Sequence, residues 1–537
     1  MSIYLIVLYI LCGVYMLLNF KRDIQMLQQN SYRPERYWRY QREHLWTGWR
    51  MTDVAMIFLL LSTLLKPALS MLIVTLVCMY KSIVAMRRRS KKPLVFTQRV
   101  WRIYTVTSVI AVAIYMAAII SFGGEYDMVE YYSGPAVSLS VLLLITAFSW
   151  VPVMLAVVLL SPVEKAINKR YWNDAKRILN SMSNLKIIGI TGSYGKTSTK
   201  HYLYRILSER FETLMTPGSY NTPMGVIRTV REMMKPYTEV FICEMGAKQR
   251  GDIKEICDLV NPEAGIITAV GPMHLETFKS LENVCRTKFE LADAIPSSGF
   301  VVVNNDFEAS AARNVENCRC IRYGIINTTG CEYIARDIMY SHEGSTFIVD
   351  HVKATGEIEW SESFTTRLVG ECNISNLLAS IIMALNMGMD IETIRRAVSR
   401  IEQVEHRLNV KKTPGGVTII DDAFNSNPSG SKMALEVLGR FTGGRRIVVT
   451  PGMIELGVEQ DNLNEALGHH IGENSDIAII VNEINRDSIV KGIKSTDFNT
   501  DNLHCVSSFV EAQQLLSSMM KSGDTVLYEN DLPDTFK

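Results

Sequence analysis

The residues with the clearest chemical pattern lie at positions 192–199 and read GSYGKTST. They follow a short apolar run at 186–191 and precede a helical pattern that extends through Leu207. A strand, a glycine-rich loop and a helix in this order are typical of a phosphate-binding loop, because glycines let backbone N–H groups turn toward phosphate oxygens. The helix N-terminus adds its partial positive charge. The pattern therefore predicts a loop that holds a triphosphate.

Two side chains of this loop have predicted roles of their own. Lys196 is placed to reach the outer phosphates, and the Thr197 hydroxyl is placed to bind Mg2+. The general Walker pattern has a glycine where Ile190 stands, so the flanking strand and helix carry the assignment. The predicted ATP-binding residues of the loop are Gly192, Ser193, Gly195, Lys196, Thr197 and Ser198.

The loop resembles that of the Mur ligase family, which reads Thr-Gly-Ser/Thr-x-Gly-Lys-Thr. Similar motifs follow over residues 186–530 in the family's order. Glu244 ends an apolar run and matches the family glutamate that binds Mg2+. His274 matches a histidine of the second metal site, and Lys288 matches a lysine that many members carbamylate, with a plain cation as the alternative. The resemblance thus implies ATP and two Mg2+ ions, catalytic roles for Lys196, Glu244, His274 and Lys288, and metal ligation through Thr197, Glu244, His274 and Lys288.

Further matches concern the nucleotide. Asn376 lies in a segment similar to the family's adenine-binding motif, although Cys372 replaces the usual histidine. Arg407 stands where the family places an arginine that meets the nucleotide phosphates, a role that suits a permanently charged, bidentate donor. Asp422 matches an aspartate expected to bind the ribose.

The substrate side is implied by two segments. Asn221 and Thr222 belong to a segment that resembles the family's Asn-x-x-x-Gly motif. Asn425 and Asn427 belong to a segment that closely resembles Asp-Asp-Ser-Tyr-Asn-Ala-Asn-Pro, which is strongest in the branch that adds D-alanyl-D-alanine to a muramyl tripeptide. The resemblance implies that these four residues contact substrate or shape the closed cleft.

The elements ahead of the loop are apolar and long. Uncharged runs at 1–20, 103–122 and 137–160 are about as long as a bilayer crossing requires, and Pro152 predicts a kink in the last of them. Residues 53–80 form a fourth apolar stretch, interrupted by Lys66-Pro67. We expect a short helical hairpin or re-entrant segment there.

Charge predicts the orientation of these segments. Residues 21–50 hold seven Lys/Arg against three acids, and residues 81–102 hold eight Lys/Arg and no acid. The positive-inside rule places both in the cytoplasm, whereas the acidic loop 123–135 suits the outside. We expect a multi-pass protein of the cytoplasmic membrane with its N-terminus outside and its ligase domains in the cytoplasm. A tether without a substrate role and a channel or transporter are the alternatives for the helices.

The predicted fold class is an α-helical membrane domain followed by α/β domains, with a central P-loop ATPase parallel sheet and a C-terminal Rossmann-like ligase domain. The predicted boundaries are a transmembrane region at 1–163, a linker helix at 164–185, the ATP-binding domain at 186–407 and the last domain at 408–537. The family's own UDP-sugar-binding domain is absent from the resemblance, and membrane helices stand in its place.

The implied function is ATP-dependent amide-bond formation through an acyl phosphate. The expected acid is a muramyl peptide or a lipid-linked envelope precursor, the expected amine is an amino acid or peptide, and membrane lipid is a further partner. The net charge of +1 gives no reason to expect nucleic acid. A poly-γ-glutamate-type capsule synthase and a catalytically silent ATP-binding scaffold are the alternatives.

Overall fold

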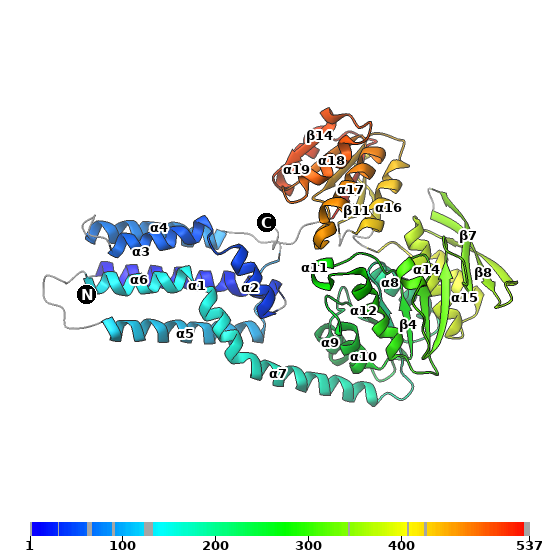
Figure 1. Cartoon of the computed structure of the whole chain (residues 1–537), viewed down its shortest axis with the longest axis horizontal. Coiled ribbons are helices and arrows are strands. Elements are labelled where there is room, and N and C mark those ends of the chain that lie inside the picture. Colours follow the sequence, from blue (N-terminus) through cyan, green and yellow to red (C-terminus); the bar gives the residue numbers. More distant parts are fainter. Residues whose placement is uncertain are drawn as a thin grey trace. The chain divides into compact units, whose positions relative to one another are not determined.

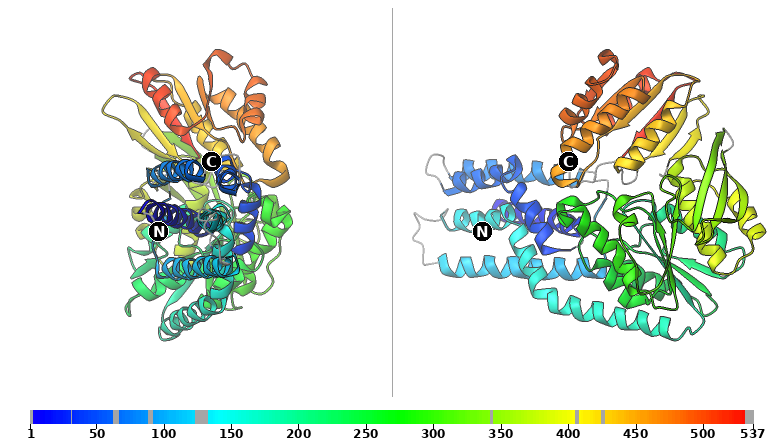
Figure 2. Two further views of the ribbon diagram at one scale, coloured as in Figure 1. Left: turned by 90° about the vertical axis from the view of Figure 1, so that its left-hand side faces the viewer. Right: turned by 45° about the vertical axis from the view of Figure 1, so that its right-hand side comes forward.

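The computed structural model describes residues 3–30, 32–61, 67–87, 92–122, 133–341, 344–404, 408–423 and 427–530. The chain forms two compact units, a helical unit at Met1–Lys169 and an α/β unit at Arg170–Asp531. The helices that begin in the helical unit, drawn in blue to cyan in Figures 1 and 2, are α1 (Ile3–Gln29), α2 (Pro34–Glu43), α3 (Gly48–Leu61), α4 (Pro67–Arg87), α5 (Gln98–Phe122), α6 (Ser133–Ala147) and α7 (Trp150–Asn180).

Three of these helices are long and apolar enough to cross a membrane, judged by length and composition over the described residues. The qualifying stretches are Leu69–Arg87, Gln98–Ala118 and Trp150–Asn180. The apolar run 1–20 forms most of α1, whose described part does not meet the same criterion. Two helices, α3 and α4, flank the predicted turn at Lys66-Pro67, and Lys66 itself lies outside the described residues.

The prediction of one helix over 137–160 with a kink at Pro152 was wrong. The chain breaks between α6 and α7, and α7 then continues without interruption to Asn180, through the segment predicted as a separate linker helix. Pro152 lies in the first turn of α7, where the backbone N–H groups have no intrahelical partner, so this proline breaks no helical hydrogen bond. The proline inside α7 is Pro162.

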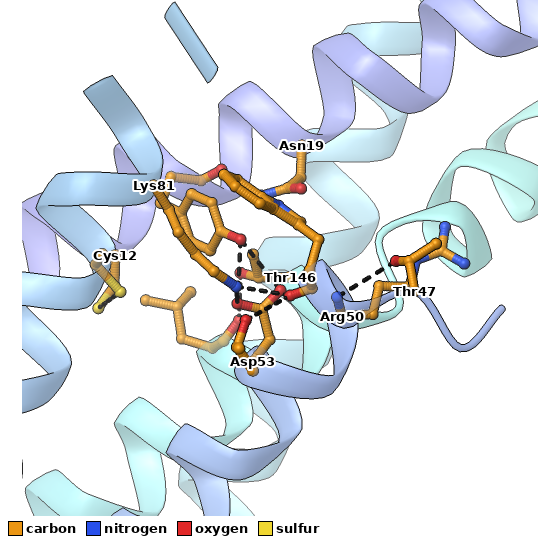
Figure 3. A network of polar contacts seen from close by, with 12 residues as sticks. Cys12, Asn19, Thr47, Arg50, Asp53, Lys81 and Thr146 are labelled. Carbon is orange, nitrogen blue, oxygen red and sulfur yellow. Dashed lines mark hydrogen bonds and ion pairs between the residues drawn. The ribbon is translucent and has the colours of Figure 1, made fainter. Parts of the chain in front are cut away.

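Charged side chains are buried where the helices of the helical unit meet (Figure 3). Asp53 of α3 accepts hydrogen bonds from Tyr15 of α1, at 3.0 Å, and from Lys81 of α4. Lys81 Nζ also donates to the Trp49 carbonyl oxygen over 2.7 Å.

Next to this cluster, Arg50 donates to Gln41 of α2 and lies 3.8 Å from Asp23 of α1. Ser149, at the break before α7, donates to the same Asp23. These bonds tie five segments of the helical unit together.

The α/β unit contains two sheets. The first has nine strands in the order β2-β3-β1-β4-β5-β6-β7-β8-β9, and its first seven strands are parallel. The strands are β1 (Lys186–Thr191), β2 (Thr213–Met215), β3 (Val240–Glu244), β4 (Ala264–Ile267), β5 (Phe300–Asn304), β6 (Arg319–Gly324), β7 (Tyr333–Ser341), β8 (Gly344–Val352) and β9 (Ile358–Thr366). Antiparallel pairing of β8 with β7 and β9 extends the expected parallel sheet.

Helices cover both faces of the first sheet because alternate strand residues point to opposite sides. Ile188 and Ile190 pack with α8, α14 and α15, whereas Ile187 packs with α9, α10 and α12. The helices in this half are α8 (Lys196–Leu207), α9 (Pro223–Met233), α10 (Asp252–Val260), α11 (Leu275–Phe278), α12 (Leu281–Ala294), α13 (Glu308–Ala311), α14 (Glu371–Asn386) and α15 (Ile391–Ser399).

The second sheet has the order β10-β11-β15-β12-β13-β14 and is parallel except for β10. Its strands are β10 (Asn409–Lys412), β11 (Thr418–Asp422), β12 (Arg446–Thr450), β13 (Ile477–Val481), β14 (Leu503–Val506) and β15 (Thr525–Glu529). Its helices are α16 (Pro428–Gly439), α17 (Gln460–Asn474), α18 (Arg486–Lys494) and α19 (Phe509–Met519), with short 3-10 turns η2 (Gly457–Glu459) and η3 (Thr500–Asn502). The α/β class predicted for this half is confirmed, and five of its six strands run parallel.

Candidate functional site

The glycine loop lies between β1 and α8, at the carboxyl end of a central strand of the first sheet. Gly195 precedes α8 with a φ of 78°, which favours glycine, and a Cβ there would collide with the Asn376 amide. A Cβ on Gly192 would likewise meet Thr268 Oγ1. Because both glycines are sterically required and α8 begins directly after them, the loop fits a triphosphate.

The loop rests on the segment that follows β4. The Ser193 amide donates to the Ala269 carbonyl oxygen over 2.6 Å, and Ser193 Oγ donates to the Gly271 carbonyl oxygen over 2.9 Å. The Lys196 side chain extends back over the loop, where its Nζ donates a hydrogen bond to the Gly192 carbonyl oxygen over 2.7 Å. Ser198, one turn into the helix, is buried. The predicted loop residues therefore form one rigid turn with an ammonium group above it.

Glu244 lies at the centre of a polar cluster next to the loop. Its carboxylate accepts hydrogen bonds from Thr197 Oγ1 at 3.2 Å and from Asn221 Nδ2 at 3.0 Å. Lys200 Nζ lies 3.0 Å from Glu244 Oε2. Burial raises the pKa of Glu244, but the charges of Lys200 and Lys196 outweigh it and hold the pKa below its usual value. The structure thus joins the P-loop to the carboxylate at the end of β3 and keeps that carboxylate ionised.

This cluster fits a hard divalent cation. Mg2+ is usually bound by one or two protein oxygens together with substrate phosphates, and the Thr197 hydroxyl and Glu244 carboxylate supply such a pair. Over the described part of the chain, no group of three or more His, Cys, Asp or Glu side chains has the arrangement of a protein-only metal site. The donor set therefore suits a cation that arrives with a nucleotide.

His274 has a hydrogen-bond partner outside the pair formed by Thr197 and Glu244. It precedes α11 with a φ of 51°, and its Nδ1 is hydrogen bonded to the carboxylate of Glu455, 181 positions later in the chain. Burial lowers the pKa of His274, which favours the neutral imidazole that metals bind. Burial raises the pKa of Glu455, but the bond from His274 and the charge of Lys248 lower it to about 2.

Lys288 points into the core from α12 and is only 2% exposed. Burial, followed by the nearby charge of Lys196, lowers the pKa of its amine well below the usual value. An ammonium group in this position is disfavoured, and the uncharged amine is favoured.

The remaining described candidates have structural partners of their own. Asn376 lies against Gly195, and the Asp422 carboxylate accepts a bond from the Leu408 amide at 3.0 Å. Thr222 and Asn427 are N-caps of α9 and α16, where they accept bonds from Gly225 and Gly430 respectively. Arg407 and Asn425 lie outside the described residues.

Sequence reasoning missed two residues of this region. Lys200, which is fully buried and pairs with Glu244, stands one helical turn after Lys196, and that spacing could have placed it on the same face of α8. Glu455 had no such local signal, because only the fold brings it to His274.

The fold and this site are those of a nucleotide-binding protein built from two α/β halves. The family model of the Mur ligase middle domain matches residues 190–384, and that of the Mur ligase glutamate ligase domain matches residues 406–528. A UDP-N-acetylmuramoyl-tripeptide–D-alanyl-D-alanine ligase of Mycobacterium leprae is 30% identical over 384 residues, covering 64% of this chain and 70% of the relative. The ligase of the same name from Bacillus subtilis is 27% identical over 359 residues, covering 66% and 75%.

The chain covers a smaller share of other relatives. It spans 49% of the length of the Mycobacterium tuberculosis ligase of the same name, with 34% identity. Among solved structures, MurF from Acinetobacter baumannii matches with a TM-score of 0.59 and 24% identity, covering 68% of this chain and 77% of that one. MurF from Thermotoga maritima in complex with ADP also matches with a TM-score of 0.59, at 23% identity, covering 68% and 80%. The chain belongs to the Mur ligase family and is an ATP-dependent, ADP-forming ligase of that class.

Proposed function

We propose that this chain is a membrane-anchored ligase that activates a carboxylate of a cell-wall or lipid-linked envelope precursor and joins it to the amine of an amino acid or peptide. The observation that carries the proposal is the Glu244 carboxylate, held 3.2 Å from the Thr197 hydroxyl beside the glycine loop. This pair provides oxygen ligands next to the position of the phosphates, where a ligase that cleaves ATP needs them.

The proposed reaction has two steps. A substrate carboxylate oxygen attacks the γ-phosphorus of ATP, which gives an acyl phosphate and releases ADP. The amine nitrogen then attacks the acyl carbon, phosphate leaves, and the nitrogen loses a proton. Mg2+, when bound with ATP, would offset negative charge on the phosphates.

The side chains around the loop have separate tasks in this scheme. Lys196 places an ammonium group over the loop, where it offsets charge that develops on the transferred phosphoryl group. Lys200 and Asn221 hold Glu244 in place. We propose Arg407 and Asp422 as nucleotide contacts and Asn425 and Asn427 as contacts of the closed cleft, as their positions in the family motifs imply.

The membrane assignment is supported by the inverted polarity of the helical unit. Large apolar side chains are exposed on its surface, among them Ile10, Leu76, Val109, Ile120 and Val158. Charged side chains, by contrast, are paired in its interior. A surface of this kind is stabilised by lipid rather than by water, and intramembrane charges are typically paired away from lipid. We propose that the helices keep the ligase close to a membrane-bound precursor.

The test is phosphate release from ATP by the purified full-length chain, measured against pairs of acids and amines. UDP-N-acetylmuramoyl-tripeptide with D-alanyl-D-alanine is the first pair, because relatives are named for it. We expect at least one pair to stimulate release, and Lys196→Ala to lower the stimulated rate about 100-fold or more. Lys254→Ala is the matched control, because Lys254 is an exposed lysine in a surface ion pair.

Three results would count against the proposal. Full turnover by Lys196→Ala would show that the loop assignment is wrong. Intact ATP binding without stimulation by any pair would favour a scaffold. Repeated addition of glutamate to one acceptor would favour a capsule-type synthase.

A further inference from the structure

We propose that Glu455 is a positioning residue that orients His274 for a divalent cation. The half of the α/β unit that contains the second sheet, called here the second-sheet half, thereby completes the metal site of the half that contains the first sheet, the first-sheet half. The inference rests on the proposed function and on the match of His274 to a metal-binding histidine of the family. It begins from a contact between residues far apart in the chain, since Glu455 follows β12 of the second sheet and His274 follows β4 of the first.

The loop that carries Glu455 is held firmly. Asn464 Oδ1 accepts a bond from the Met453 amide at 2.8 Å, and Asn485 Nδ2 donates to the carbonyl oxygens of Pro451 and Met453. Both asparagines are buried. A carboxylate presented from such a loop has its position set before any ligand arrives.

Both partners adopt a backbone conformation that ordinary residues avoid. The φ angle is 51° at His274 and 64° at Glu455. Left-handed conformations at residues other than glycine are costly and cluster at functional sites, where the surrounding structure enforces them. Because both ends of this contact are strained, the surrounding structure must hold each residue in place.

The bonding of the imidazole shows what the contact can do. Glu455 meets Nδ1 of His274. A carboxylate at that atom fixes the tautomer with the proton on Nδ1 and leaves the Nε2 lone pair available to a cation. Carboxylates commonly orient metal-binding histidines in this way and increase their basicity. The second oxygen of Glu455 lies 3.4 Å from Lys248 Nζ, which keeps the carboxylate directed at the first-sheet half.

One consequence is a link between the two halves of the α/β unit. The short helix after His274, α11, packs against η2, which follows Glu455. If the second-sheet half withdraws, His274 loses the partner that fixes its ring. Cation affinity would then depend on engagement of the last domain, and phosphoryl transfer would be favoured only in the closed enzyme.

The experiment measures Mn2+ binding by electron paramagnetic resonance, using the full-length chain with an ATP analogue that has a β–γ imido bridge. We expect Glu455→Ala to weaken Mn2+ binding about 10–100-fold. Glu455→Gln keeps an oxygen that can accept from Nδ1–H, and we expect it to restore part of the affinity. Nucleotide binding measured in EDTA should stay at the wild-type level in both variants.

Two further variants separate positioning from general disruption. Glu483→Ala removes an exposed carboxylate from the half that contains the second sheet, and wild-type Mn2+ affinity is expected. In a His274→Ala background, Glu455→Ala should have no additional effect, because it acts through the imidazole. Wild-type Mn2+ affinity in Glu455→Ala, together with weakened binding in His274→Ala, would refute this inference and leave the proposed function intact. Failure of the wild-type chain to bind Mn2+ with nucleotide would overturn both.

Discussion

Lys288 illustrates how burial decides the chemistry of a single residue. Its amine is enclosed, and burial and Lys196 lower its pKa, so the uncharged form is favoured. An uncharged amine can attack the carbon of CO2, forming a carbamate and releasing one proton. The product would be an anion that the charge of Lys196 stabilises and that can ligate a cation.

We predict that Lys288 is carbamylated. After equilibration with ¹³C-bicarbonate, the wild-type chain should show a carbamate signal in its ¹³C NMR spectrum. Lys288→Met should lose that signal and lower stimulated phosphate release about 100-fold or more, because the variant lacks the anionic ligand. Lys254→Met, at an exposed position, should keep both. Equal spectra for the wild type and Lys288→Met would show that the lysine is unmodified.

Residue patterns predicted the glycine loop and its neighbouring carboxylate, which the structure brings together, whereas the substrate contacts stay predictions. The P-loop could be predicted because strand, glycines and helix are contiguous in the sequence. Thr222 and Asn427, which are predicted substrate contacts, each cap a helix and precede a proline, a local signal for a helix start. Glu455 could not be predicted, because no local pattern reports a contact made by the fold.

At the scale of elements, the buried pair of Asp53 and Lys81 joins α3 to α4, and Tyr15 adds α1. We predict that Asp53→Asn lowers the stability of the helical unit by about 3–5 kcal/mol, because it leaves the Lys81 ammonium buried without a counterion. The double variant Asp53→Asn/Lys81→Met should be more stable than the single one. The measurement is the midpoint of thermal unfolding of the full chain in detergent.

If the double variant were no more stable than Asp53→Asn alone, the pair would not be coupled. An unchanged midpoint in Asp53→Asn would show that the network does not contribute to stability.

A neighbouring bond of the helical unit lies at the helix break before α7, which the sequence did not predict. Residues 137–160 are apolar throughout, so hydropathy indicates one crossing. The break before α7 is stabilised by the bond from Ser149 to Asp23, 126 positions earlier. Hydropathy reports the length of an apolar run, whereas a helix end inside it depends on a distant partner. The parallel strands and their helices were predictable from the alternation of pattern, but the antiparallel addition of β8 and β9 was not.

At the scale of the whole molecule, the charge distribution predicts an orientation in the membrane. The positive-inside rule predicts that the basic segments 21–50 and 81–102 lie on the cytoplasmic side and that the acidic segment 123–135 lies outside. The ligase half then lies inside, where ATP is available. This arrangement assigns opposite sides of the membrane to positions 125 and 505.

We therefore predict that a membrane-impermeant maleimide labels Glu125→Cys in intact cells, whereas the exposed native Cys505 reacts only after permeabilisation. Because Cys505 belongs to the same chain, its labelling reports membrane integrity in each sample. In a Cys505→Ser background, labelling seen before permeabilisation can be assigned to position 125. The full chain should also stay with the membrane fraction after an alkaline wash, because apolar helices rather than charge would hold it there. Labelling of Cys505 in intact cells would reverse the orientation, and release by the wash would rule out an integral membrane anchor.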